Sequence, residues 1–139
     1  AVGKAATVSR LLPSFVRLLQ DPEAEVRASA AKNVARYCDL VGPAKFVSDI
    51  VPCLRDLASD VAQAVRVCLA EAVVDVVGRL PPADANAHLT PLLLMFLRPE
   101  EAPEVRLKVI GALDRIASAV GPDVVGSKIL PALETLRGD

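Results

Sequence analysis

The sequence predicts an all-α fold in which antiparallel helix pairs repeat along the chain and stack side by side as a solenoid. The first observation is a recurring proline inside matching apolar segments, at Pro13, Pro52, Pro91 and Pro131, with spacings of 39, 39 and 40 residues. The second is the helical period of the apolar residues within each unit. Because one helix pair of this size cannot bury its apolar faces alone, the units are expected to stabilise one another by stacking.

A second marker keeps the same register as the prolines. Val-Arg dipeptides that end at Arg27, Arg66 and Arg106 have spacings of 39 and 40 residues. The one extra residue therefore falls between Pro91 and Arg106. Two independent markers with one period indicate a true structural repeat.

The first helix of each unit carries an i, i+1, i+4, i+7, i+8 stripe of apolar residues. In the first complete unit this stripe consists of Leu11, Leu12, Phe15, Leu18 and Leu19. The recurring proline is expected in the first turn of the helix, where its missing N–H is no loss. The polar segment 20–25, which contains Pro22, is then expected to end the helix and to place acidic residues at the start of the next one.

The second helix begins with the Val-Arg marker and needs a wide apolar face, since it is expected to touch its partner helix and both neighbouring repeats. In the second unit this face consists of Val65, Leu69, Val73, Val76 and Leu80. The helices are expected to end, and the chain to turn toward the next unit, at Gly42-Pro43, Pro81-Pro82 and Gly121-Pro122.

These signals divide the chain into five parts. Residues 1–8 are expected to be the tail of a preceding repeat, and residues 124–139 the first helix of a further one. Complete repeats are expected at 9–45, 46–85 and 86–123. We therefore expect the chain to be a segment of a longer array that self-associates through its uncapped ends at high concentration.

Composition and charge exclude several functional classes. The chain has 16 Lys and Arg against 17 Asp and Glu, so it lacks the positive field that holds a nucleic-acid backbone. Its longest uncharged apolar run, residues 89–97, is too short to span a bilayer. We therefore expect neither nucleic acid nor a membrane as a partner.

The cysteine usage and the motif content also argue against chemistry. Cys38, Cys53 and Cys68 are an odd number, and the sequence holds one histidine. This usage is typical of buried thiols in a reducing compartment, and it favours a cytoplasmic location, with the nucleus as a second one. No dinucleotide-binding, P-loop or nucleophile-elbow motif occurs. We therefore expect no catalytic residue, no cofactor and no metal.

A unit written L-L-P-x-L-x-x-L-x-x-D, followed by V-R and an Ala-rich helix, resembles the HEAT repeat, and the match covers nearly the whole chain. More specific stretches are similar to the scaffolding (A) subunit family of protein phosphatase 2A, namely LLPSFVRLLQDPEAEVRASAAKNVARYC, IVPCLRDLASDVAQAV, HLTPLLLMFL and APEVRLKVIGALD. The resemblance implies a right-handed α-solenoid of HEAT repeats.

The resemblance also implies a function. It predicts a non-catalytic scaffold, not an enzyme, that holds both the catalytic and the interchangeable regulatory subunits of a phosphatase. Contacts in that family run along the turns between the two helices of each repeat. The residues of this chain that fall in those turns, and so are implied to contact partners, are Asp21, Glu23, Glu25, Ser59, Asp60, Gln63, Glu100, Glu101 and Glu104. The third acidic group either meets a basic partner or is simply solvated.

The family further has a ladder of Asp and Arg residues that bridges successive repeats. It maps to Arg27, Arg66 and Arg106, together with Asp21 and Asp60. The strict repeat of the arginines, and the bidentate geometry of guanidinium, favour a structural role for them over partner binding.

The third repeat departs from this ladder. Pro99 stands where the third Asp is expected, and the extra residue enlarges the turn 98–103. The sequence therefore does not identify the carboxylate of that rung. Asp139 aligns with Asp21 and Asp60 at the start of the following turn.

Leu94 and Met95 stand where the neighbouring repeat has the polar Arg55 and Asp56, so the helix 92–97 is apolar nearly all round. This helix either packs unusually deeply or presents an apolar patch to a partner. We expect the patch.

Two other classes remain as alternatives. A nuclear-transport or chromosome-associated HEAT adaptor would present acidic inner faces or basic grooves. The predicted inner rows are mixed instead, and consist of Lys32, Glu71 and Gly111, and of Arg36, Asp75 and Arg115. An enzyme on a helical-repeat scaffold, such as a base-excision glycosylase, needs a basic, aromatic-lined groove, which the balanced charge and the absence of Trp oppose.

Overall fold

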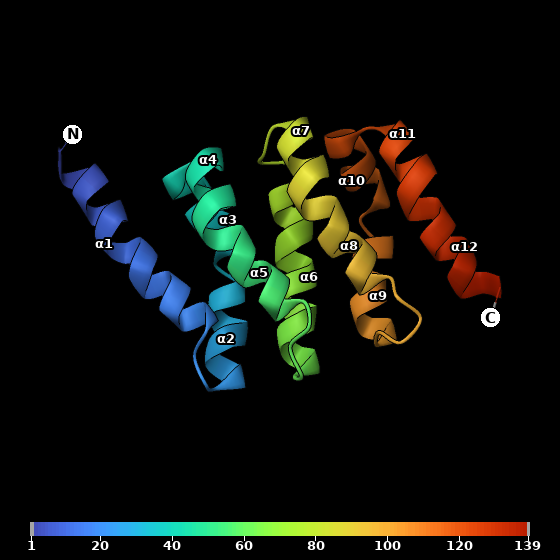
Figure 1. Ribbon diagram of the computed structural model, residues 1–139, viewed down its shortest axis with the longest axis horizontal. Coiled ribbons are helices and arrows are strands. Elements are labelled where there is room, and N and C mark those ends of the chain that lie inside the picture. The colour runs from blue at the N-terminus through green and yellow to red at the C-terminus, as the bar shows by residue number, and fades with distance from the viewer. Residues whose placement is uncertain (1, 139) are drawn as a thin grey trace.

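The computed structural model describes residues 2–138, with the side chains of residues 11–135. Within these residues the chain forms helices and no strand. Figure 1 shows the helices in two layers, which progress side by side from the blue N-terminal end to the red C-terminal end. The prediction of an all-α solenoid of antiparallel helix pairs is therefore confirmed.

One layer contains the first helix of each repeat and is called the first-helix layer. Its members are α1 (Val2–Leu19), α4 with η1 and α5 (Pro43–Lys45, Phe46–Ile50, Val51–Leu57), α7 with η2 and α8 (Pro82–Asp84, Ala85–Leu89, Thr90–Phe96), and α11 with η3 and α12 (Pro122–Val124, Val125–Ile129, Leu130–Gly138).

The other layer contains the second helices and is called the second-helix layer. Its members are α2 with α3 (Ala24–Ala31, Val34–Val41), the single helix α6 (Gln63–Val77), and α9 with α10 (Pro103–Ile110, Leu113–Val120). Figure 1 places the turns within repeats along one edge of both layers and the turns between repeats along the opposite edge.

The repeat boundaries lie a few residues earlier than the sequence predicts. The first helices begin at Pro43, Pro82 and Pro122, directly after the helix-ending positions. Gly42 has φ 85° and Gly121 has φ 99°, conformations that glycine adopts most easily, and these glycines reverse the chain between layers. Residues 2–8, which the sequence interpretation assigns to the tail of a preceding repeat, are continuous with residues 9–19 in α1. Residues 1 and 139 of the predicted units lie outside the described part.

Pro52, Pro91 and Pro131 are the second residues of α5, α8 and α12, so these prolines lie in the first α-helical turn, as the sequence predicts. Pro13 differs because it lies inside α1, and α5, α8 and α12 each directly follow a π-helical turn. The N–H of Val51, just before Pro52, bonds to the carbonyl of Phe46 five residues back, and Thr90 and Ala85 form the same pair before Pro91. This wider turn relieves the clash between the proline ring and the preceding turn of helix.

The second helices differ in continuity. α2 and α3 are separated at residues 32–33, and α9 and α10 at the equivalent residues 111–112, whereas α6 is unbroken. At both breaks the chain tightens to an i−3 hydrogen bond, from Asn33 N to Ala30 O (3.0 Å) and from Ala112 N to Val109 O (3.0 Å). Asn33 and Gly111 are weak helix formers, whereas Glu71 and Ala72 at the same place in α6 are strong ones.

The core lies between the two layers and between successive repeats, and it is aliphatic. α6 contacts both neighbouring second helices, and its inward side chains are fully buried, including Val65, Leu69 and Val73. An aromatic pair occurs in the first repeat, where Phe15 stacks on Tyr37 with ring centroids 3.9 Å apart. Burial on both sides of α6 is what its wide apolar face predicts.

Burial also sets the chemistry of the cysteines. Cys38 and Cys53 are buried free thiols, and Cys68 is half-buried. Burial raises the pKa of Cys38 to about 11 and also raises the pKa of Cys53, so both remain protonated near neutral pH.

The described residues also bear on metals and membranes. No cluster of three or more His, Cys, Asp or Glu side chains there is arranged to hold a metal ion. Taken singly, none of the described helices has both the length and the hydropathy to cross a membrane; one bent pair, Leu113–Val120 with Pro122–Thr135, reaches them in combination, with 119° between its arms.

Candidate functional site

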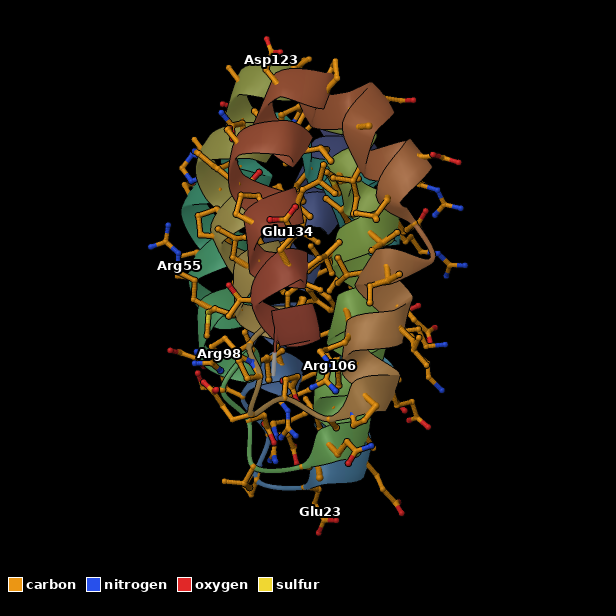
Figure 2. The ribbon with its side chains drawn as sticks, turned by 90° about the vertical axis from the view of Figure 1, so that its right-hand side faces the viewer. Glu23, Arg55, Arg98, Arg106, Asp123 and Glu134 are labelled. Carbon is orange, nitrogen blue, oxygen red and sulfur yellow. The ribbon has the colours of Figure 1, made fainter. Side chains whose placement is uncertain are left out.

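The candidate site is the edge of the molecule formed by the turns within the three repeats. These turns are residues 20–23, 58–62 and 97–102, and we call this surface the turn edge. Figure 2 shows Glu23 at this end of the molecule and Asp123 at the opposite end. The repeat therefore brings together side chains that are far apart in the sequence.

Each turn is closed by a carboxylate that accepts a backbone hydrogen bond. Asp21 Oδ1 accepts the N–H of Glu23 (2.8 Å), and Asp60 Oδ1 accepts the N–H of Ala62 (2.8 Å). In the third turn Glu101 Oε1 accepts the N–H of Ala102 (2.8 Å). Short acidic side chains favour such turns because they satisfy backbone groups that precede a helix.

The first rung of the ladder joins Arg27 to Asp60 of the next repeat. The Nε and Nη2 atoms of Arg27 donate to Asp60 Oδ2 and Oδ1 at 2.7 and 3.1 Å, which is a bidentate pair. The Nη1 atom of Arg27 donates to the carbonyls of Asp21 (2.7 Å) and Pro22 (3.0 Å). One guanidinium thus fastens its own turn to the turn of the following repeat.

The electrostatics of this rung favour the ionised pair. Burial works against the charged form of Asp60, but the hydrogen bonds from Arg27 and from Ala62 N–H outweigh it and lower the pKa of Asp60. The hydrogen bond to Asp60 likewise raises the pKa of Arg27.

The second rung uses Glu101, which the sequence interpretation places among the partner-contacting residues. Arg66 Nε donates to both Glu101 oxygens at 2.9 and 3.0 Å, and Arg66 Nη1 donates to the carbonyl of Asp60 (2.6 Å). The Glu101 side chain is only 3% exposed. Glu101 is therefore a strut between repeats rather than a free surface charge.

The extra residue in the third turn explains this substitution. Pro99 occupies the expected Asp position but has no carboxylate, and the enlarged turn carries Glu101 over Arg66 instead. Glutamate has one methylene more than aspartate, which gives it the additional reach. Sequence reasoning missed Glu101 as a rung because its separation from Arg66 is 35 residues, against 33 for Arg27 and Asp60.

Arg106 occupies the corresponding place in the third repeat. Its Nη1 donates to the carbonyl of Glu101, and to that of Pro99 at 3.4 Å. The arginine thus closes its own turn in the same way as Arg27. Asp139, which aligns with the carboxylate of a further rung, lies outside the described residues.

With Asp60 and Glu101 engaged in the ladder, the remaining turn residues divide by exposure. Asp21 is half-buried. The exposed members of the predicted set are Glu23, Glu25, Ser59, Gln63, Glu100 and Glu104. Four of these six residues are carboxylates, and Glu25, Gln63 and Glu104 lie in the first turns of α2, α6 and α9, directly beside the turn edge.

One exposed residue of the turn edge was missed by sequence reasoning. Val61 lies in the middle turn and is 94% exposed, the most exposed large apolar side chain in the described part. The available signal was a β-branched residue at a turn position that holds Pro22 in the preceding repeat. An apolar side chain held in solvent between acidic turns is suited to contact another protein.

The predicted apolar patch at Leu94 and Met95 is only partly exposed. Both side chains are half-buried and pack against the hydrophobic core. Their helix α8 therefore packs more deeply than a surface patch requires, while part of each side chain remains accessible.

Comparisons with known proteins agree with this architecture. A family model described as PPP2R1A-like HEAT repeat matches residues 4–80, which is more than half of the chain. The chain is 36% identical over 119 residues to the beta isoform of the 65 kDa regulatory A-type subunit of serine/threonine-protein phosphatase 2A from Homo sapiens, covering 82% of this chain and 20% of that protein. For the same isoform of Mus musculus the identity is 37% over 92 residues, covering 63% of this chain and 15% of that protein.

The chain thus spans no more than about a fifth of the length of these curated relatives. The match extends over the first two repeats and their ladder arginines, Arg27 and Arg66, which the structure places in one register. The chain therefore belongs to the PPP2R1A-like HEAT repeat family.

Proposed function

We propose that this chain forms part of a non-catalytic scaffold that holds subunits of protein phosphatase 2A against its turn edge. The relatives are named as regulatory A-type subunits of that phosphatase, and the family membership supports the same role here. The alignment of three turns on one edge carries the proposal, because it creates a continuous surface with its own charge and an exposed apolar residue.

The ladder supports this role physically. A scaffold must keep its contact residues in fixed relative positions, since each side chain left to order on binding weakens the complex. The Arg27–Asp60 and Arg66–Glu101 pairs join adjacent turns directly behind the surface. The exposed carboxylates and Val61 are therefore held on a pre-organised edge.

A binding experiment tests the proposal. Purified catalytic and regulatory subunits of the phosphatase are titrated separately with the chain, and affinity is measured by calorimetry. We expect at least one of them to bind, and Val61→Asp and Glu104→Lys each to weaken that binding about tenfold, as is typical of central contact residues. Glu134→Lys is the control, because Glu134 is exposed on α12 in the first-helix layer, away from the turns (Figure 2). Failure of both subunits to bind, or an equal effect of Glu134→Lys, contradicts the proposal.

We also propose that copies of this chain associate end to end. Leu11 in α1 is 41% exposed, whereas Ile50 at the same position of the next repeat is fully buried. At the other end Ile110 is 38% exposed, and Ala70 at its position in α6 is fully buried. Burying these two surfaces against each other would remove apolar area from water. Sedimentation of the chain at rising concentration tests this, with Ile110→Lys expected to reduce the association.

A further inference from the structure

A groove on the second-helix layer lies apart from the turn edge. It has a volume of about 510 Å³ and lies between α6 and the broken helix α9–α10, with Lys32 of the first repeat at one side. The groove exists because Gly111 has no side chain. The equivalent positions of the two earlier repeats carry the long charged residues Lys32 and Glu71, so the floor of the groove is open at Gly111. We call it the inner groove.

The carboxylates of the inner groove already have partners. Glu71 Oε1 lies 2.9 Å from Lys108 Nζ, and this hydrogen bond raises the pKa of Lys108. Asp75 Oδ1 lies 3.6 Å from Arg79 Nη2 on the same helix. Neither carboxylate is therefore free to neutralise a cation across the groove.

Two cations of the inner groove lack such partners. Within the part of the chain that the structure describes, no carboxylate lies within 4.0 Å of Lys32 or of Arg115. Both side chains are exposed, and they come from the repeats on either side of α6. A ligand that spans the groove thus meets an unpaired positive charge at each side.

The inner groove also contains an exposed apolar side chain. Leu107 lines the groove and is 62% exposed, whereas Val67 and Ala28 hold this position in the preceding repeats and are half-buried. A nucleic acid is disfavoured because the chain, with 16 Lys and Arg against 17 Asp and Glu, lacks the positive field that holds a phosphate backbone. A basic segment is disfavoured by Lys32 and Arg115.

We infer that the inner groove is a docking site for an acidic segment of a partner protein, in which carboxylates flank an aliphatic side chain. The carboxylates pair with Lys32 and Arg115, and the aliphatic group packs on Leu107 above the floor at Gly111. None of these residues belongs to the turn edge, so this site is separate from the surface proposed for the phosphatase subunits.

A peptide titration tests the inference. The probe is a short acetylated peptide in which glutamate pairs alternate with leucine, and the matched peptide has glutamine in place of each glutamate. Amide signals of the full chain are followed by two-dimensional NMR. We expect shifts of Leu107, Gly111 and Arg115 with the acidic peptide, and at least tenfold weaker binding of the glutamine peptide, since the ion pairs are lost.

Variants locate the binding. Arg115→Glu is expected to weaken the acidic peptide about fivefold, and raised salt to weaken it further. Arg55→Glu is the control, because Arg55 is exposed on the first-helix side and points away from the groove in Figure 2. Gly111→Glu restores the side chain that α6 carries at Glu71, and it is expected to fill the floor and abolish binding with unchanged helix content in circular dichroism.

Several results overturn the inference. One is the absence of amide shifts at millimolar peptide. Others are shifts confined to the turn edge or to the end surface at Ile110, equal binding of the two peptides, and an Arg55→Glu effect as large as that of Arg115→Glu. These variants do not change the turn edge. A failure of the inference therefore does not contradict the proposed binding of phosphatase subunits, which the separate binding experiment tests.

Discussion

Removing the Glu101 carboxylate is expected to destabilise the chain far more than its place in an acidic turn suggests. Glu101→Ala deletes the hydrogen bond from Arg66 Nε–H, which both Glu101 oxygens share, and the one from Ala102 N–H. It leaves the Arg66 guanidinium without its counter-charge between two repeats. The change acts on the connection between repeats and removes no contact of the aliphatic core.

The magnitude follows from the burial of the pair. Losing one partner of a buried ion pair typically destabilises a protein by about 3–5 kcal/mol. Arg66 keeps its bond to the Asp60 carbonyl, and its side chain is 18% exposed, so water replaces part of the lost interaction. We therefore expect a loss near the lower bound, about 3 kcal/mol, or about 10 °C in the unfolding midpoint of a chain of this size. Glu101→Gln keeps one oxygen acceptor and is expected to lose about half as much.

Thermal and urea unfolding, followed by circular dichroism, measure this effect. The matched control is Glu100→Ala in the same turn, because the Glu100 side chain is 70% exposed and lies 3.8 Å from Arg98. This control is expected to change stability by less than about 0.5 kcal/mol. If the two alanine variants lose the same stability, Glu101 is not a rung of the ladder and the reasoning is refuted.

Three further predictions concern other positions. Because Arg27 and Ala62 N–H lower the pKa of Asp60 in the folded chain, its stabilisation is complete above a pH of about 4 and is lost as the pH falls further; acid unfolding of Asp60→Asn is expected to lack this component. Thr90 is buried with an unpartnered hydroxyl where the preceding repeat has Val51, so Thr90→Val is expected to raise the free energy of unfolding by about 1 kcal/mol, and an unchanged urea midpoint contradicts this. Gly42→Ala, at φ 85°, is expected to lose about 1–2 kcal/mol, whereas Gly78→Ala, at a negative φ in open space, is expected to be neutral or slightly stabilising.

Much of the fold is predictable from the sequence because it depends on periodic features. The spacing of the prolines and of the Val-Arg pairs predicts stacked helix pairs, and the structure places them in one register. The π-helical turns that precede Pro52, Pro91 and Pro131 are not predictable in this way. A first-turn proline is the usual arrangement, but the π-helical turns, which have no simple sequence signature, join these helices to the short helices before them.

The candidate site is predictable only in part. The turn edge follows from the repeat, and the structure places Arg27 and Asp60 in contact. If the ladder had a fixed spacing, Glu101 would be a surface residue. The insertion in the third turn instead brings the Glu101 carboxylate to Arg66, so the ion pair between repeats is preserved. Val61 and the inner groove depend on exposure and on the loss of a side chain at Gly111, which a single sequence does not reveal.

The breaks in the second helices affect how the molecule yields to force. The ladder joins neighbouring turns at the turn edge, whereas the second helices on both sides of α6 are interrupted at residues 32–33 and 111–112. When the array bends, we expect the deformation to concentrate at these interruptions, because an intact helix resists bending more than a tightened turn does. We therefore expect the edge opposite the ladder to open and close while α6 stays straight.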